Sequence, residues 1–158
     1  MKNNFKKRFN FNLQYPKPLE ENELGGLLEV AKSGLLSRYT SNVVNEVEDE
    51  LAKYYEMQYA VTCTSGTAAL HGSLVALDFP PGSEIITTSV ADIGIVIPII
   101  YENLIPVFAD IDDTYNITAE NIEKKITNNT KAVIAVHLAG NPCNLDELVS
   151  LCNKKNII

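Results

Sequence analysis

A run of small and hydroxylated residues, Ser65-Gly66-Thr67-Ala68, has the composition of a site that binds a phosphate group. Ser65 and Thr67 carry hydroxyl groups that can donate to an anion, and Gly66 has no side chain to keep an anion away from the backbone. A helix that begins here would present N–H groups that have no partner within the helix and carry partial positive charge. The residue types therefore predict a site for a phosphate monoester or a similar anion.

Other phosphate-binding motifs do not fit this segment. The spacing is not GxGxxG, and the lysine of GxxxxGK[ST] is missing, which disfavours a dinucleotide site and a P-loop. The alternative is that Ser65 and Thr67 only cap a helix, which is the commoner role of such residues at such positions. The surrounding elements favour the anion site, because ligands of open α/β sheets bind where a strand ends and a helix begins.

The chain alternates between helical and strand-like patterns. Helices are predicted at 20–33, 43–55, 67–77, 93–101, 120–126 and 144–154. Strands are predicted at 58–64, 84–88, 105–111 and 131–137, with a further strand beginning at 156–158. Residues 93–101 fit a helix or a strand imperfectly because of Pro98, and the helix is favoured because the neighbouring strands need a crossover. This order predicts an α/β fold with a mostly parallel sheet, helices on both faces and right-handed crossovers.

Composition is that of a folded domain and argues against several classes of partner. The 158 residues are 46% hydrophobic and 21% charged, with a net charge of −7. That charge argues against a nucleic-acid or anionic-membrane surface, and no segment has the roughly 20 apolar residues needed to cross a bilayer. Cys63, Cys143 and Cys152 match neither a disulfide framework nor a metal site. We therefore expect packing cysteines, no bound metal and a cytoplasmic protein.

The two ends of the chain differ from its middle. Residues 1–19 are expected to form an N-terminal leader, whose basic cluster, Lys6-Lys7-Arg8, is interpreted as a solvated tail, with targeting as the alternative. At the other end, the last predicted strand stops after Ile157 and Ile158 without a turn or cap. Because a strand that stops inside a sheet leaves backbone groups unpaired, we expect residues 20–158 to be an incomplete domain.

A series of sequence blocks resembles the DegT/DnrJ/StrS family of nucleotide-sugar aminotransferases, which depend on pyridoxal phosphate (PLP). The blocks are EVEDELA at 46–52, AV at 60–61 with SGTAAL at 65–70, PGSEII at 81–86, PVFADID at 106–112, TKAV at 130–133 and VHLAGNP at 136–142. No single block is specific, but their order and spacing are. The resemblance runs from about residue 20 to the end and implies the N-terminal portion of a PLP-dependent transferase type I large domain.

The resemblance also implies residue roles and partners. The N–H groups of Gly66, Thr67 and Ala68, next to Ser65, would hold the phosphate of PLP. His137, at the end of a predicted strand, would lie near the cofactor, although a structural role is the favoured interpretation. Two subunits would share each active site in a homodimer. The substrates would be a keto-sugar nucleotide and an amino-acid donor, glutamate or glutamine.

Asp92 departs from the family pattern. The family commonly has an aromatic residue there, which stacks on the pyridine ring of the cofactor. A carboxylate cannot stack, so either Asp92 has a role specific to a subgroup or the loop is shifted by one residue. Two other departures, Thr88 for a usual Pro and Asn144 for a usual Asp, are interpreted as neutral.

No catalytic residue is assigned within the chain. The resemblance places the Schiff-base lysine and the acid that pairs with the pyridine nitrogen beyond Ile158, and none of Lys131, Lys154 or Lys155 matches the lysine motif. The complete protein is therefore predicted to be an aminotransferase acting on a keto-sugar nucleotide in glycan or sugar biosynthesis. Two alternatives stay open: a sugar dehydratase of the same family, with histidine in place of the lysine, and a non-catalytic fragment.

Overall fold

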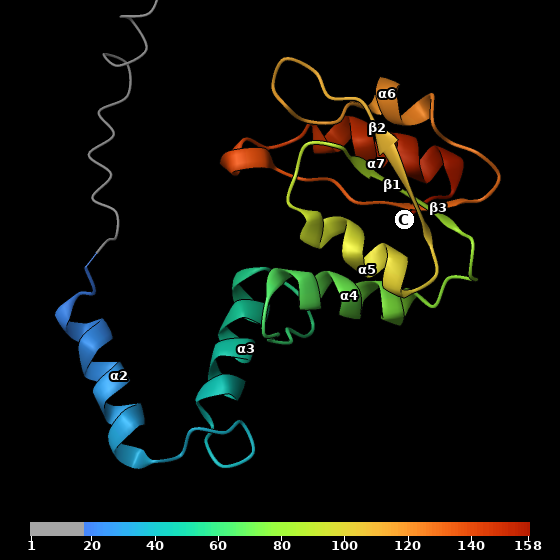
Figure 1. Cartoon of the computed structure of the whole chain (residues 1–158). Helices are drawn as coiled ribbons and strands as arrows, with labels where there is room; N and C mark the ends of the chain where they lie inside the picture. Colours follow the sequence, from blue (N-terminus) through green and yellow to red (C-terminus); the bar gives the residue numbers. More distant parts are fainter. Residues whose placement is uncertain (1–17) are drawn as a thin grey trace, which may run out of the picture. The chain divides into compact units, whose positions relative to one another are not determined.

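The computed structural model describes residues 18–158, which divide between Val61 and Thr62 into two compact units (Figure 1). Each unit is described by itself. The basic cluster predicted to lie in a leader, Lys6-Lys7-Arg8, falls outside the described residues. Within 18–158, no helix is both long enough and apolar enough to cross a membrane.

The described part of the first unit contains two helices at the predicted places, α2 (Glu21–Ser33) and α3 (Val43–Tyr54). A capping box begins α2, because the backbone N–H of Glu20 donates to Glu23 Oε2 at 2.7 Å. Gly34 ends the helix with φ 68°, in the left-handed region that favours glycine. Local interactions therefore define both ends of α2.

The strand predicted at 58–64 is wrong. These residues have no regular secondary structure, and the side chains of Tyr59 and Val61 are 77% and 75% exposed. Alternating apolar residues form a strand only where a sheet edge and a core are available to cover them. In the described part of the chain, the sheet is built entirely from later strands.

The second unit is built around a three-stranded parallel sheet in the order β2-β1-β3. The central strand β1 (Glu84–Thr88) pairs on one side with β2 (Ile105–Ala109) and on the other with β3 (Thr130–Val133). Ile158 extends this pattern at the outer edge of β3. Its N–H donates to the carbonyl of Lys131 at 3.0 Å, and its carbonyl accepts from the N–H of Val133 at 2.8 Å. The parallel pairing expected of residues 156–158 is thus present at Ile158.

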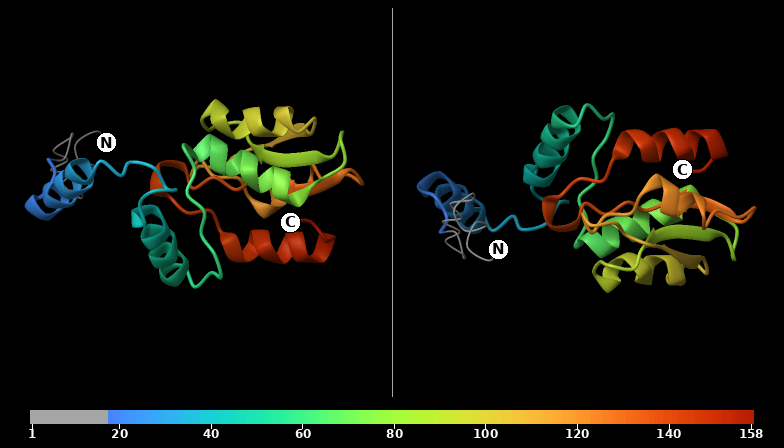
Figure 2. Two further views of the ribbon diagram at one scale, coloured as in Figure 1. Left: turned by 90° about the horizontal axis from the view of Figure 1, so that it is seen from below. Right: turned by 90° about the horizontal axis from the view of Figure 1, so that it is seen from above.

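Helices cover both faces of this sheet (Figures 1 and 2). On one face lie α4 (Gly66–Leu77) and α5 (Val96–Tyr101), and on the other lie α6 (Ala119–Glu123) and α7 (Leu145–Lys155). Two short 3₁₀ helices, η1 (Ile93–Ile95) and η2 (Leu138–Gly140), follow β1 and β3. The predicted α/β class, with a mostly parallel sheet between two helical layers, is confirmed.

Each face of the sheet has its own apolar cluster. The cluster beneath α4 and α5 consists of Leu74, Ile85, Ile99, Leu104 and Ala132. The cluster beneath α6 and α7 consists of Ile86, Ala109, Ile117, Ile122, Cys143, Leu148 and Leu151. Neighbouring residues of β1 enter opposite clusters because successive side chains of a strand point to opposite faces. The sheet is therefore buried on both sides, as parallel sheets usually are.

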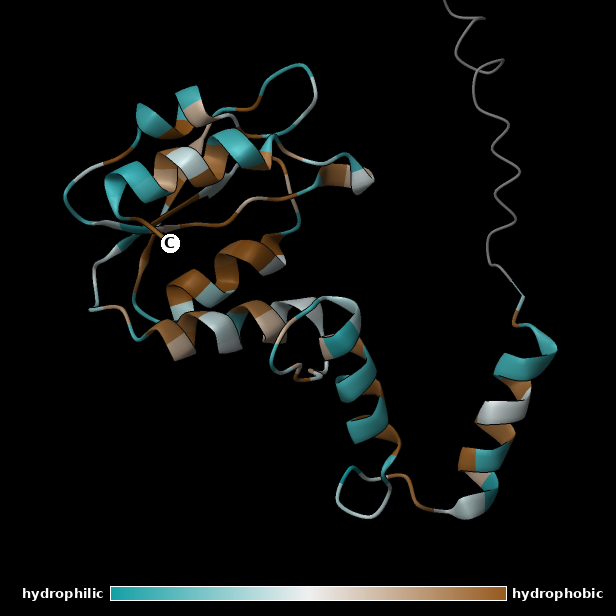
Figure 3. Cartoon of the chain, turned by 180° about the vertical axis from the view of Figure 1, so that it is seen from behind, coloured by the Kyte–Doolittle hydropathy of each residue, from teal (hydrophilic) through white to brown (hydrophobic). Residues whose placement is uncertain are grey.

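Residues 93–101 are helical, as η1 followed directly by α5. Pro98 is the third residue of α5, where its missing N–H has no partner within the helix to lose. Figure 3 shows the apolar character of α5, whose sequence is VIPIIY. Its Ile99 is completely buried against the sheet, whereas Ile100 is 56% exposed.

The packing of α5 predicts opposite outcomes for two neighbouring substitutions. Ile99→Ala should lower the free energy of unfolding by about 2–5 kcal/mol, because it opens a cavity in the cluster beneath α4 and α5. Ile100→Ala is the matched control and should change it by less than about 1 kcal/mol. Urea denaturation followed by circular dichroism measures both. Equal effects of the two substitutions would contradict this packing of α5.

Candidate anion-binding site

Residues 65–68 form the N-cap and first turn of α4. Ser65 is the N-cap residue, and its Oγ accepts the N–H of Ala68 at 3.1 Å. The N–H groups of Gly66 and Thr67 have no acceptor among residues 18–158, and Ser65 and Gly66 are exposed. Capping and anion binding are therefore compatible here: the cap uses the amide of Ala68, two amides remain, and the Ser65 hydroxyl keeps its hydrogen for donation.

Neither packing nor backbone conformation requires a glycine at position 66. A Cβ placed on Gly66 would meet nothing within 4 Å, and its φ lies outside the left-handed region. The missing side chain instead leaves open space beside two unpaired amides at the start of a 12-residue helix. The helix dipole adds partial positive charge at the same point, so this turn has the features that attract a phosphate group.

The first turn of α4 lies against the loop that follows the central strand. A Cβ placed on Gly94 of η1 would overlap the hydroxyl oxygen of Thr67, so these two residues are in direct contact. Because η1 follows the carboxyl end of β1, the turn lies at the carboxyl edge of the parallel sheet. Ligands of open α/β sheets bind at that edge.

Asp92 caps η1. Its Oδ1 accepts the N–H of Gly94 at 2.7 Å, and its side chain is exposed. The structure thus brings Thr67, Asp92 and Gly94 together, although only the first two were predicted as site residues. The Asp-x-Gly spacing is a recognised signal for an Asx turn and would have pointed to Gly94.

His137 follows β3, the neighbour of β1, and therefore lies at the same edge of the sheet. Its Nδ1 accepts the backbone N–H of Cys143 at 3.0 Å. A neutral imidazole that accepts at Nδ1 carries its hydrogen on Nε2, so exposed His137 presents a donor at that atom. This hydrogen bond joins His137 to the loop before α7 and not to α4.

A buried amide braces the loop after His137. Asn116 is 3% exposed; its Nδ2 donates to the carbonyl of Asn141 at 3.0 Å, and its Oδ1 accepts from the N–H of Leu138 at 3.4 Å. The bend itself uses left-handed conformations, with φ 51° at Ala139 and 81° at Gly140. These hydrogen bonds of Asn116 were not predicted from the sequence, because nothing in the sequence indicates which distant loop an asparagine side chain will contact.

The three cysteines have different environments. Cys143 packs in the cluster beneath α6 and α7, where burial raises the pKa of its thiol, and its Sγ donates to the carbonyl of Val136 at 3.2 Å. Cys152 is half-buried, with its thiol pKa also raised by burial, and Cys63 is exposed. The packing role is confirmed for Cys143. Within residues 18–158 no three His, Cys, Asp or Glu side chains are grouped to hold a metal.

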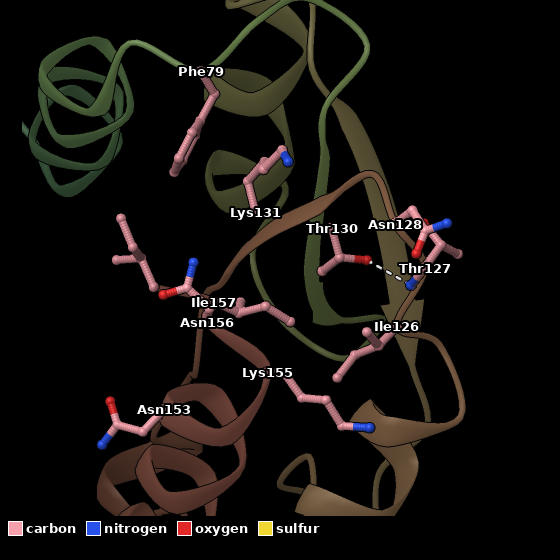
Figure 4. A pocket seen from close by; sticks show the side chains of 11 residues that line it. Phe79, Ile126, Thr127, Asn128, Thr130, Lys131, Asn153, Lys155, Asn156 and Ile157 are labelled. Carbon is pink, nitrogen blue, oxygen red and sulfur yellow. Dashed lines mark hydrogen bonds between the residues drawn. The ribbon is translucent and has the colours of Figure 1, made fainter.

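A large cavity lies away from the first turn of α4. It has a volume of about 990 Å³ and is lined by residues that include Phe79, Thr130, Lys131, Lys155 and Ile157 (Figure 4). Thr130 begins β3, so the cavity is at the amino edge of the sheet, opposite the edge where such folds bind ligands. We therefore place the functional site at the turn of α4 and not in this cavity.

Comparison with known proteins gives a consistent result. The profile of the DegT/DnrJ/EryC1/StrS aminotransferase family matches residues 17–158. A GDP-perosamine synthase of Escherichia coli O157:H7 is 38% identical over 117 residues, which are 73% of this chain and 32% of that protein. The chain thus spans only a minor part of the length of this relative.

Solved structures give the same match. The aminotransferase from Psychrobacter cryohalolentis aligns with a TM-score of 0.84 and 33% identity, over 89% of this chain and 36% of that one. The E. coli GDP-4-keto-6-deoxy-D-mannose-3-dehydratase with bound hydrated PLP aligns with a TM-score of 0.79 and 30% identity, over 90% of this chain and 38% of that one. The sequence profile, the relatives and the fold agree that this chain belongs to the DegT/DnrJ/EryC1/StrS aminotransferase family.

Proposed function

We propose that this chain supplies the phosphate-binding part of a PLP-dependent aminotransferase that acts on a keto-sugar nucleotide. The observation that carries the proposal is the first turn of α4, where the amides of Gly66 and Thr67 are unpaired at the carboxyl edge of the sheet. Membership of the family and the similarity to a GDP-perosamine synthase support the reaction and the substrate class. The amino donor would be glutamate or glutamine, and the protein would act in the cytoplasm.

The residues of this turn fit the phosphate group of PLP. In this proposal Gly66 and Thr67 donate their backbone N–H groups to phosphate oxygens, and the hydroxyls of Ser65 and Thr67 add further donors. Ala68 contributes through the Ser65 cap, because its own N–H already donates to Ser65 Oγ at 3.1 Å. These contacts hold and orient the cofactor, whose ring supplies an electron sink when it is bound.

His137 is the second candidate contact at the same edge. With Nδ1 held by the Cys143 amide, the ring is fixed in orientation and tautomer, and Nε2–H is available to an acceptor on the ligand. Asp92 is not proposed to stack on the ring, since its carboxylate caps η1. The environment of Asp92 therefore supports a role in building the loop.

The lysine and the acid that complete the chemistry are proposed to lie outside residues 1–158. Lys155 pairs with Glu123 at 3.0 Å, and Lys131 lines the cavity at the opposite edge of the sheet. Neither lysine is placed to act at the first turn of α4. A second subunit is also part of the proposal, and the exposed apolar residues Leu24, Leu27 and Leu28 of α2 support such a partner surface.

One comparison favours a second reaction. The dehydratase that matches at TM-score 0.79 acts on a GDP-4-keto-6-deoxy sugar according to its name, and it has the same fold over this part of the chain. The two reactions differ in outcome: an aminotransferase moves nitrogen from the amino donor to the sugar, whereas a dehydratase removes a hydroxyl group from it. Incubation of the complete protein with ¹⁵N-labelled glutamate and a keto-sugar nucleotide distinguishes them, since only the aminotransferase gives a labelled sugar.

The open space at Gly66 predicts opposite effects on stability and on binding. Gly66→Ala should not lower the free energy of unfolding, because the Cβ meets no atom and alanine favours helix over glycine. It should weaken pyridoxamine phosphate binding by about tenfold, or roughly 1.4 kcal/mol, because the methyl group occupies the phosphate's place. Amide chemical shifts of Gly66, Thr67 and Ala68 during titration report the affinity, and pyridoxamine without phosphate should not shift them.

Gly72→Ala is the matched control for this prediction. Gly72 lies in the middle of the same helix, is exposed, and likewise has nothing within 4 Å of a Cβ. Its substitution should stabilise the chain by about 0.5–1 kcal/mol and leave the affinity unchanged. If both substitutions leave the affinity for pyridoxamine phosphate unaltered, the assignment of the phosphate to this turn is wrong.

The proposed place of the catalytic lysine can be tested on the 158-residue chain itself. Treatment with PLP and then borohydride should give no lysine-linked adduct at a single defined position, because no lysine of the chain is assigned to the cofactor. Peptide mapping by mass spectrometry measures this, with free lysine at equal concentration as the control for random labelling. Stoichiometric labelling of Lys131, Lys154 or Lys155 would overturn the assignment.

A further inference from the structure

Gly94 is the one described glycine whose position leaves no room for a side chain. It is buried in η1, and a Cβ added to it would overlap the Thr67 hydroxyl oxygen and lie 2.8 Å from Asp92 Oδ1. Both distances are shorter than real Cβ contacts allow, so a side chain at this position forces its neighbours to move. For Gly25, Gly26, Gly66 and Gly72, by contrast, no atom lies within 4 Å of an added Cβ.

Backbone conformation does not explain this glycine. Its φ is outside the left-handed region, so an alanine would be tolerated by the backbone itself. Glycine also costs about 0.5–1 kcal/mol in a helix compared with alanine. The lack of a side chain is therefore the property that matters here, because it lets Thr67, the second residue of α4, lie directly against the loop that follows β1.

Asp92 holds Gly94 in this position. The N–H of Gly94 donates to Asp92 Oδ1 at 2.7 Å, which fixes the start of η1. The hydroxyl of Thr67 then occupies the space that a side chain on Gly94 would need. The loop after β1 and the first turn of α4 are thus joined through one small residue.

We propose that Gly94, held by Asp92, is a positioning residue for the phosphate-binding turn. It sets how closely the first turn of α4 approaches the carboxyl end of β1, and it fixes the direction of the Thr67 hydroxyl. The inference rests on the proposed function, since it concerns the same turn. It also gives Asp92 a role that an aromatic residue at this position would not have.

The test is a double-mutant cycle of Gly94→Ala and Thr67→Ala in the full chain, with Gly72→Ala as the control. The readouts are the urea midpoint and the affinity for pyridoxamine phosphate relative to pyridoxamine, which isolates the contribution of the phosphate. Gly94→Ala alone should lower this preference about fivefold or more, because the methyl group displaces Thr67. In the Thr67→Ala background the same change should have a clearly smaller effect, because the overlap with the Thr67 oxygen is gone and only the contact with Asp92 Oδ1 remains.

A second pair of variants covers the case in which Gly94→Ala fails to fold. Asp92→Asn and Asp92→Ala both remove the negative charge, but only asparagine keeps an oxygen that can accept the Gly94 N–H. Asp92→Ala should therefore show a lower phosphate preference than Asp92→Asn at equal charge. Equal preferences in this pair would overturn the positioning role.

The outcomes separate the inference from the proposed function. If the wild-type chain shows no preference for pyridoxamine phosphate over pyridoxamine, the proposed function fails and the positioning role falls with it. If the wild type shows the preference and the effects of Gly94→Ala and Thr67→Ala simply add, only the positioning role is overturned. The positioning role is also overturned if the effects of Gly94→Ala and Thr67→Ala are non-additive in the urea midpoint but additive in the phosphate preference. Gly94 would then contribute to stability and not to binding.

Discussion

The parallel pairing of β1 on both of its edges is the constraint on which the second unit depends. Ile85 to Thr88 are buried in succession, and the strand is hydrogen-bonded to β2 and to β3. A parallel neighbour can be reached only by a crossover, and the crossovers place helices on both faces. The same geometry brings the ends of β1 and β3 to one edge. The loops that contain Asp92 and His137 are therefore neighbours at that edge because of the ladder, although 45 positions separate them in the chain.

The candidate site uses backbone groups more than side chains. Two unpaired amides at the start of α4, an open space at Gly66 and a cap at Ser65 form the cradle, and each depends on where the helix begins. Side chains act mainly by holding backbone in place: Asp92 holds η1, and Asn116 holds the bend after His137.

The two edges of the sheet have different characters. The amino edge has a cavity of about 990 Å³, but its lining includes two lysines, one of which is already paired with Glu123. The carboxyl edge has the free amides, the open space at Gly66 and an imidazole with one nitrogen already engaged. The start of α4 is therefore proposed as the site on the ground of its chemistry and not of a cavity volume. A phosphate group needs donors and a positive potential, and the start of α4 combines both with open space.

Local periodicity, caps and turn residues were enough to predict the helices, most strands and the α/β class, and they pointed to the start of α4 as a candidate phosphate site. In the structure, Glu20, Gly34, Thr118 and Asn144 are the cap residues at helix ends. Tertiary structure alone decided that residues 58–64 form no strand, since pairing needs a partner that alternation cannot guarantee. It also decided that Thr67, Asp92 and Gly94 meet, and that Cys143 fixes the tautomer of His137. Those contacts join segments distant in the chain, and only the packing of the sheet and its helices brings such segments together.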